Sequence, residues 1–116
     1  MSEMILVYTT CNDEKEAQKI GEHLLKKRLA TCINIYPSMH SLFWWPPLKG
    51  KMDHAEESVL VAKTVEEKWP EVEAEILAVH SYEIPEVVAL PVIHVNEKYL
   101  SWIKDEMYLD RPGTHG

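Results

Sequence analysis

This sequence of 116 residues is poor in glycine, cysteine and phenylalanine, with four, two and one copies, and it has no long apolar run. A membrane-spanning helix needs roughly 20 consecutive apolar residues, and no stretch approaches that length. The opening residues MSEMILVYTT carry no basic segment ahead of their short apolar stretch, so no secretory signal is predicted. We therefore expect a cytoplasmic protein without a membrane partner, in which Cys11 and Cys32 are free thiols.

Positive charge is also scarce, because 12 lysines and arginines face 19 aspartates and glutamates and leave a net charge of −7. Affinity for nucleic acid comes largely from basic side chains that neutralise phosphates, so no nucleic-acid partner is predicted. The one basic run, Lys26 to Arg28, falls where a first helix should end, and cations there complement the helix dipole. An RNA-binding sheet would also need aromatic residues on its central strands, and ESVLVAKT has none.

Apolar and β-branched segments predict four strands. The second and third strands form a long hairpin with its tip at Pro46, Pro47 and Gly50, and Pro91 requires an edge position for the last strand. The segment before Pro37 is apolar on both faces, which is typical of a strand covered on both sides. The predicted strands cover residues 4–10, 29–37 continuing into 39–45, 57–64 and 85–95.

Three helices are predicted between and after these strands. Asp13 and Glu16 have the spacing of a capping box and begin the first helix, while Pro70 places the start of the second between Glu66 and Pro70. Thr64 and Glu67 repeat the capping-box spacing. The third helix covers residues 97–107 behind Asn96 as its cap. The inner faces would carry Ala17, Ile20, Gly21, Leu24 and Arg28 on the first helix and Val72, Ile76 and His80 on the second.

The order β-α-β-β-α-β followed by a helix predicts a ferredoxin-like α+β sandwich. Residues 1–107 would form a single domain and residues 108–116 a C-terminal tail. Two helices cover one face of such a sheet, and the other apolar face then has no cover within the chain. Large exposed apolar surfaces usually mark interfaces, so we expect a closed homo-oligomer.

Seven short motifs in this sequence, in this order, resemble the CutA divalent-cation tolerance proteins. None is specific alone, but the set extends from about Met4 to Met107. The motifs are VYTT at 7–10, KKRLATCINI at 26–35, WW at 44–45, GK at 50–51, KT at 63–64, HSYEIPEV at 80–87 and NEKYLSW at 96–102.

The resemblance implies a homotrimer whose long second and third strands reach neighbouring subunits. It also implies tolerance to divalent metals, notably copper, a PII-like signalling or sensing role, and no established enzymatic reaction. Two departures stand out. The longer tip PPLK replaces the family's usual single acidic residue, and a copper cysteine of one branch would fall near Tyr8 while the histidine before His80 is Val79. Only His80 remains from that ligand set.

The predicted metal ligands are His80, Cys11 and Cys32. His80 ends the second helix, where its imidazole is a ligand suited to copper or zinc or a structural group. Cys11 is expected in a loop beside a helix N-terminus, which would lower its pKa and make it the more reactive thiol. Cys32 is expected in a central strand as a small buried residue. No local spacing assembles a closed four-ligand zinc site, so any site would be weak or shared between subunits.

A cleft between subunits is predicted around Glu57, Lys63, Tyr82 and Trp45. Glu57 and Lys63 share one face of the third strand and would form an intersubunit ion pair or line a polar cleft. Tyr82 would have a positional role through its hydroxyl, and one of the two adjacent tryptophans would fill an interface pocket. The remaining strand and turn histidines, His40, His54 and His94, are expected to be surface or structural groups.

Three other functions compete with that of a metal-linked trimer. An acylphosphatase-like enzyme needs an arginine in its first loop, and TTCNDE supplies acidic residues that repel phosphate, so we expect no enzyme. An RNA-binding module is disfavoured by the charge and the missing aromatics. A trimeric scaffold without a specific metal site stays open, because sequence does not separate it from a metal-binding trimer.

Overall fold

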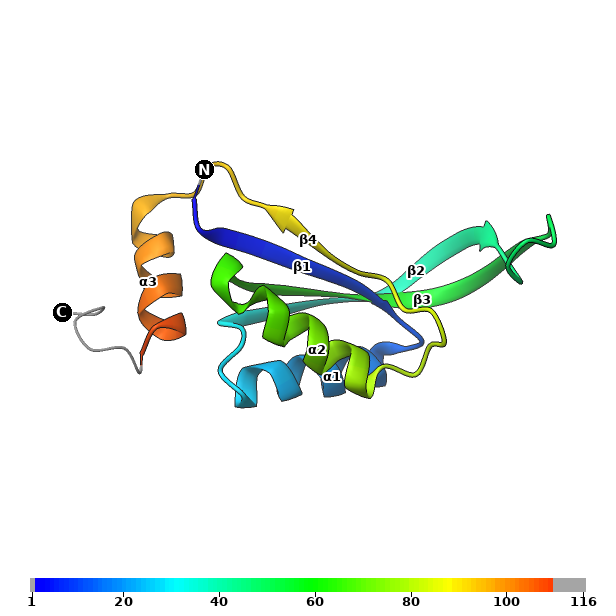
Figure 1. Cartoon of the computed structure of the whole chain (residues 1–116), viewed down its shortest axis with the longest axis horizontal. Coiled ribbons are helices and arrows are strands. Elements are labelled where there is room, and N and C mark those ends of the chain that lie inside the picture. Colours follow the sequence, from blue (N-terminus) through cyan, green and yellow to red (C-terminus); the bar gives the residue numbers. More distant parts are fainter. Residues whose placement is uncertain (1, 110–116) are drawn as a thin grey trace.

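A computed structural model describes residues 2–109 and confirms the predicted order of elements (Figure 1). The fold is α+β and consists of a four-stranded antiparallel sheet in the order β2-β3-β1-β4. Helices α1 and α2 cover one face of the sheet, while α3 lies at one end (Figure 1). The elements are β1 (Met4–Cys11), α1 (Glu14–Lys26), β2 (Cys32–Trp44), β3 (Met52–Val65), the 3-10 turn η1 (Glu66–Lys68), α2 (Trp69–Val79), β4 (Val87–Pro91) and α3 (Glu97–Met107).

The ends of α1 follow from local chemistry. Asp13 accepts a hydrogen bond from the Glu16 N–H at 2.8 Å, and Glu16 Oε1 accepts one from the Asn12 N–H at 2.8 Å, so the predicted capping interaction forms. Lys26 lies in the last turn, as predicted, and Arg28 follows with a φ of 59°. Its expected place on the inner face is wrong, because this left-handed residue ends the helix and its side chain is exposed.

The core between α1, α2 and the sheet is tightly packed. Ile20, Leu24, Leu60 and Ile76 are essentially inaccessible to solvent. Gly21 lies so close to β2 that an added Cβ would be 2.7 Å from Ile33 Cγ2. A side chain at this position would therefore force the helix and the strand apart.

Helix α3 builds a second, smaller core at the other end of the sheet. In this core, residues of α3 and the residue after it pack against the ends of β1 and β3. Its buried members are Met4, Val65, Ile103, Met107 and Tyr108. The expectation that the second face has no cover is thus wrong at this end of the sheet. Tyr108 is buried one residue beyond the predicted domain boundary, and residues 110–116 of the predicted tail lie outside the described range.

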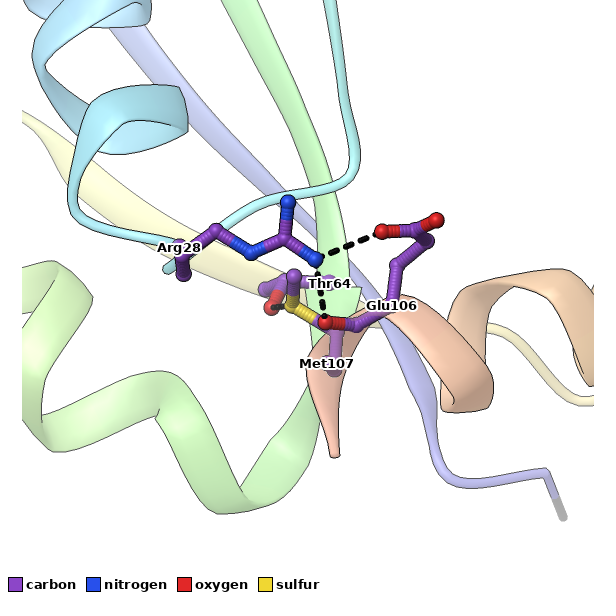
Figure 2. A network of polar contacts seen from close by, with 4 residues as sticks. All are labelled: Arg28, Thr64, Glu106 and Met107. Atoms are coloured by element: carbon purple, nitrogen blue, oxygen red, sulfur yellow. Dashed lines mark hydrogen bonds and ion pairs between the residues drawn. The ribbon is translucent and has the colours of Figure 1, made fainter. Parts of the chain in front are cut away.

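Polar contacts tie α3 to the rest of the chain (Figure 2). One guanidinium nitrogen of Arg28 donates to the Glu106 carboxylate at 2.6 Å and to the Glu106 carbonyl at 3.1 Å, which satisfies a helix C-terminus. The Thr64 hydroxyl donates to Met107 Sδ at 3.1 Å. Thr64 therefore does not cap the second helix as its spacing suggested, and α2 begins at Trp69, within the predicted interval.

Strands β2 and β3 form a hairpin that projects well beyond the two helices (Figure 1). Strand β2 continues through Pro37 with one irregularity between Tyr36 and Met39. It is an edge strand of the sheet and is not covered on both sides, contrary to the prediction. Strand β4 is also an edge strand, as Pro91 required, but it is only five residues long.

Among residues 2–109, no helix combines the length and apolar composition needed to cross a membrane.

Candidate functional site

A cleft of about 830 Å³ lies between the hairpin and the segment that leads from α2 to β4. The hairpin contributes Phe43, Trp45 and Glu57 to its wall, and the connecting segment contributes Tyr82 and Glu86. The lining combines aromatic rings with carboxylates, and the described residues contribute no lysine or arginine to it. Such a surface favours a cation that also has apolar parts.

The polar centre of the cleft is a hydrogen bond between Tyr82 and Glu57. The Tyr82 hydroxyl donates to Glu57 Oε2 at 2.7 Å, and only 9% of Glu57 is exposed. Burial raises the pKa of Tyr82, and the bond to the Glu57 carboxylate raises this pKa further, so the phenol stays protonated. The predicted positional role of Tyr82 thus has a definite partner.

The structure separates the four residues predicted for the cleft. Glu57, Tyr82 and Trp45 line it, whereas Lys63 does not. The Lys63 ammonium lies 5.7 Å from the centre of the Tyr99 ring, beneath α3 at the far end of the sheet. Trp44 is 71% exposed and lies in the strand next to Trp45, which is half-buried in the cleft wall.

A second cluster lies behind Tyr82 and brings together Cys11, Glu16 and His80. One ligand atom from each side chain lies within 4.8 Å of the others. Tyr82 connects this cluster to the cleft, since its ring centroid is 4.8 Å from that of His80 while its hydroxyl reaches Glu57. Two of the three predicted metal ligands therefore meet, together with a carboxylate.

His80 is held by hydrogen bonds at both ring nitrogens. It is the C-cap of α2 with extended backbone, so it does not continue the inner face of the helix as predicted. Its Nδ1 accepts from the Tyr82 N–H at 3.1 Å, and its Nε2 lies 2.8 Å from the Thr10 carbonyl. Because a carbonyl only accepts, Nε2 carries the proton and the ring is the neutral Nε2–H tautomer.

Cys11 differs from the expected reactive thiol. It is the last residue of β1, fully buried, and opposite Ser58 in β3. Burial raises the pKa of Cys11 to about 12, and the nearby Glu16, Glu57 and Asp13 carboxylates add to this shift. Burial, which covers the whole side chain, outweighs the expected effect of the neighbouring helix N-terminus.

Glu16 completes the cluster and was predicted only as a helix-capping residue. One carboxylate oxygen accepts from the Asn12 N–H and the other from the Ser81 N–H at 2.9 Å. Burial alone would raise the pKa of Glu16, but the bonds from Ser81 and Asn12 outweigh it and hold this pKa below its ordinary value. No sequence signal linked Glu16 to His80, because the contact joins residues 64 positions apart.

The donor atoms of this cluster fit a divalent transition metal, since thiolate, imidazole and carboxylate are all ligands for copper or zinc. The existing hydrogen bonds of His80 oppose the binding of a metal. A metal must displace the thiol proton of Cys11 and one hydrogen bond of His80. Cys32 does not contribute, because it is half-buried on the edge strand opposite Lys63. Lys63, the partner of Cys32, is five positions along β3 from Ser58, the partner of Cys11. This is roughly 17 Å at the usual rise per residue.

The other histidines lie away from the cluster. His94 is exposed near the start of α3, as expected for a surface group. His40 and His54 are also exposed, but their rings stack at a centroid distance of 5.8 Å on the hairpin. The sequence alone did not pair them, because the pairing depends on the register of β2 against β3.

Comparisons with known proteins all indicate the same family. A model of the CutA1 divalent ion tolerance protein matches residues 5–106. The divalent-cation tolerance protein CutA of Archaeoglobus fulgidus is 39% identical over 99 residues, which are 85% of this chain and 93% of that protein. The chloroplastic protein CutA 1 of Oryza sativa is 35% identical over 101 residues, which are 87% of this chain but 55% of the rice protein.

Solved structures agree with the sequence relatives. CutA from Xylella fastidiosa superposes with a TM-score of 0.85 at 31% identity, covering 91% of this chain and 99% of that one. The structure described as the periplasmic divalent cation tolerance protein CutA from Archaeoglobus fulgidus has a TM-score of 0.84 at 36% identity, covering 90% and 98%. The chain therefore belongs to the CutA1 divalent ion tolerance protein family.

Proposed function

We propose that this protein is a homotrimer that binds a divalent metal ion, copper in the first instance, in a homeostasis or signalling role. The observation that carries the metal part is the meeting of Cys11, Glu16 and His80 within 4.8 Å. Tyr82 joins that cluster to a cleft that a neighbouring subunit would complete. The family's role in divalent ion tolerance supports a cation as the ligand.

The exposed hairpin supports self-association. Tyr36, Leu42, Trp44 and Met52 are between 59% and 71% exposed, and all four belong to the hairpin strands β2 and β3. An apolar hairpin of this kind is typically buried by a second copy. Sedimentation equilibrium at low micromolar concentration tests this part: a mass about three times the 13.4 kDa of one chain is expected, and a folded single chain would refute it.

Copper binding at the cluster must be coupled to proton release. The Cys11 thiol, with its pKa raised to about 12, loses its proton only when the metal takes its place. The hydrogen bond between His80 Nδ1 and the Tyr82 N–H must also break if that nitrogen becomes the ligand. Binding is therefore weaker than the donor set alone suggests, and it strengthens as the pH rises.

Titration of the purified protein with Cu²⁺ tests the metal part. His80→Ala and Cys11→Ser should each weaken binding, with the proton release measured in two buffers of different ionisation enthalpy. Cys32→Ser is the matched control, since this second thiol lies in another part of the sheet. Equal affinity in all three variants would refute the cluster as the site.

A small organic ligand in the cleft is a further part of this proposal. Its walls carry aromatic rings and the carboxylates of Asp53, Glu57, Glu83 and Glu86, which suits a compact cationic molecule. Screening cationic metabolites by thermal shift, with Trp45→Ala as the variant, addresses this part. A ligand that binds equally to both proteins does not use the cleft.

The second candidate function is a trimeric scaffold without a specific metal site. One observation favours it. Both carboxylate oxygens of Glu16 and both ring nitrogens of His80 already make hydrogen bonds, so of the possible metal ligands in the cluster only the Cys11 sulfur is not held in this way. In either function we infer a non-enzymatic role and a location in the cytoplasm, supported by two free cysteines. Because the Archaeoglobus relative is described as periplasmic, cell fractionation with a tagged chain tests the location.

A further inference from the structure

The distal hairpin carries a pair of histidines that the proposed function does not use. His40 of β2 and His54 of β3 have ring centroids 5.8 Å apart with planes inclined by 22°. In the register of the hairpin, His40 pairs with Glu56 and His54 pairs with Leu42. The two histidines are therefore diagonal neighbours on one face of a two-stranded ribbon, and both are exposed.

The separation of the two rings suits a shared metal ion. The observed 5.8 Å lies within the range of ordinary aromatic pairs, and it also matches the spacing of two imidazoles on one ion. At metal–nitrogen distances of about 2.0–2.1 Å, two imidazoles on one ion have ring centroids roughly 5–6 Å apart. The strand pairing already holds the rings at this spacing, so side-chain rotation alone would turn one nitrogen of each ring toward a common ion.

Glu56 is placed by the register to offer a third donor atom, a carboxylate oxygen, and a compensating charge. It lies directly opposite His40 and two residues from His54, on the same face by register, and it is exposed. The neighbouring positions on this face are Leu42, Trp44 and Met52, none of which is basic. The face thus has two imidazoles and a carboxylate with no lysine or arginine to repel a cation.

We propose that His40, His54 and Glu56 bind a divalent transition-metal ion on the hairpin. Imidazole nitrogen with one carboxylate is a donor set suited to Zn²⁺, Cu²⁺ and Ni²⁺, and water fills the remaining positions. This site is independent of the Cys11–Glu16–His80 cluster. Along β3, His54 is four residues from Ser58, the partner of Cys11, which is roughly 13 Å at the usual rise.

The site needs less rearrangement than the cluster. Its ligands are exposed in the single chain, so no buried thiol must lose a proton and no structural hydrogen bond of a histidine ring must break. Zn²⁺ is therefore expected to bind here before it binds the cluster. On this hairpin, metal binding would also stiffen the segment proposed to contact neighbouring subunits.

Calorimetric titration of the metal-free full chain with Zn²⁺ tests the site. His40→Asn and His54→Asn should each weaken the tightest binding step on the order of tenfold or more, because losing a ligand costs more affinity than losing a residue that only hydrogen-bonds to a ligand. The double variant should be little weaker than either single one, because one remaining imidazole no longer chelates. His94→Asn is the matched control, and it should bind like the unmodified protein.

The carboxylate has its own control. Glu56→Gln should weaken binding by a smaller factor than loss of either histidine, whereas Asp105→Asn on the exposed side of α3 removes the same charge without effect. Sedimentation of each variant verifies that the assembly is intact. Unchanged Zn²⁺ affinity in both His40→Asn and His54→Asn would overturn the proposal.

Two further experiments distinguish the hairpin site from the Cys11–Glu16–His80 cluster of the proposed function. If His80→Asn and Cys11→Ser abolish Zn²⁺ binding while the hairpin variants keep it, the metal belongs to the cluster and the hairpin site is refuted. As a second measurement, the ring protons of His40 and His54 should shift together along one titration curve in NMR spectra. Shifts with different midpoints would show two separate histidines and also refute the site.

Discussion

Leu60 and Leu42 lie on the same hairpin and, by register, on the same side of the sheet, yet Leu60 is inaccessible to solvent and Leu42 is 66% exposed. The difference comes from the helix layer. Over the first half of the hairpin, α1 approaches closely enough for Gly21 to lie near both Ile33 and Leu60. Over the second half, no helix of residues 2–109 lies against the hairpin (Figure 1).

The two halves of the hairpin therefore contribute differently to the protein. The covered half supplies the stability of one chain, because its side chains are removed from water within that chain. The projecting half leaves apolar side chains and the His40–His54 pair accessible in the single chain, which suits the proposed contacts with other copies and with ions. The cleft and the Cys11–Glu16–His80 cluster lie where the two halves meet.

The sharpest test of this division compares two leucines. Leu60→Ala should lower the free energy of unfolding by about 2–5 kcal/mol, because it leaves a cavity beneath α1. This loss should persist at every protein concentration in urea denaturation. Leu42→Ala should instead lower the apparent stability more strongly on dilution, because it weakens association. Similar concentration dependence for the two variants would contradict the division.

Tyr82→Phe tests the junction between the halves. The substitution leaves the nearly buried Glu57 carboxylate without its donor, which should cost about 1–3 kcal/mol. Chemical denaturation measures the loss. Tyr36→Phe, which alters an exposed tyrosine of the hairpin, is the matched control. Equal stability of both variants would mean that water replaces the Tyr82 hydroxyl.

Gly21→Ala tests the closeness of the helix layer. Alanine has the higher helix propensity by about 1 kcal/mol, but its Cβ would be 2.7 Å from Ile33 Cγ2. Overpacking of this kind costs about 1–3 kcal/mol, so we expect a small net destabilisation. Lys19→Ala, at an exposed position of the same helix, should be close to neutral. A stabilised Gly21→Ala variant would show that α1 moves away freely.

The two thiols offer the mildest test, by alkylation of the native protein. At a pH of about 8, Cys32 should react and Cys11 should not, since burial raises the pKa of Cys11 from 9.0 to about 12. The unfolded thiol ionises first as the pH rises through this window, so Cys11 lowers stability from pH 9.0 upward. A Cys11→Val variant should lack this contribution. Rapid alkylation of native Cys11 would contradict its burial.

Much of the fold was predictable because it depends on short-range patterns. The Asp13–Glu16 capping interaction and the start of α2 near Pro70 follow from interactions within one turn of a helix. The predicted bounds of α3 also match, and Asn96 is its N-cap residue, but the Asn96 side chain makes no capping hydrogen bond. The family resemblance was confirmed by the family model and by the relatives. Local spacing failed at Thr64, where packing under α3 gave the hydroxyl a sulfur acceptor in place of a cap.

The sequence by itself determined the order and type of the elements, the ferredoxin-like class and the residues available as ligands, because periodicity and capping act over a few neighbouring positions. Only the tertiary structure decided which of those residues meet. It joined Glu16 to His80, removed Lys63 and Cys32 from the predicted sites, buried Cys11 and paired His40 with His54. The physical reason is that strand register and helix packing set distances between residues far apart in the chain, and no local pattern encodes those distances.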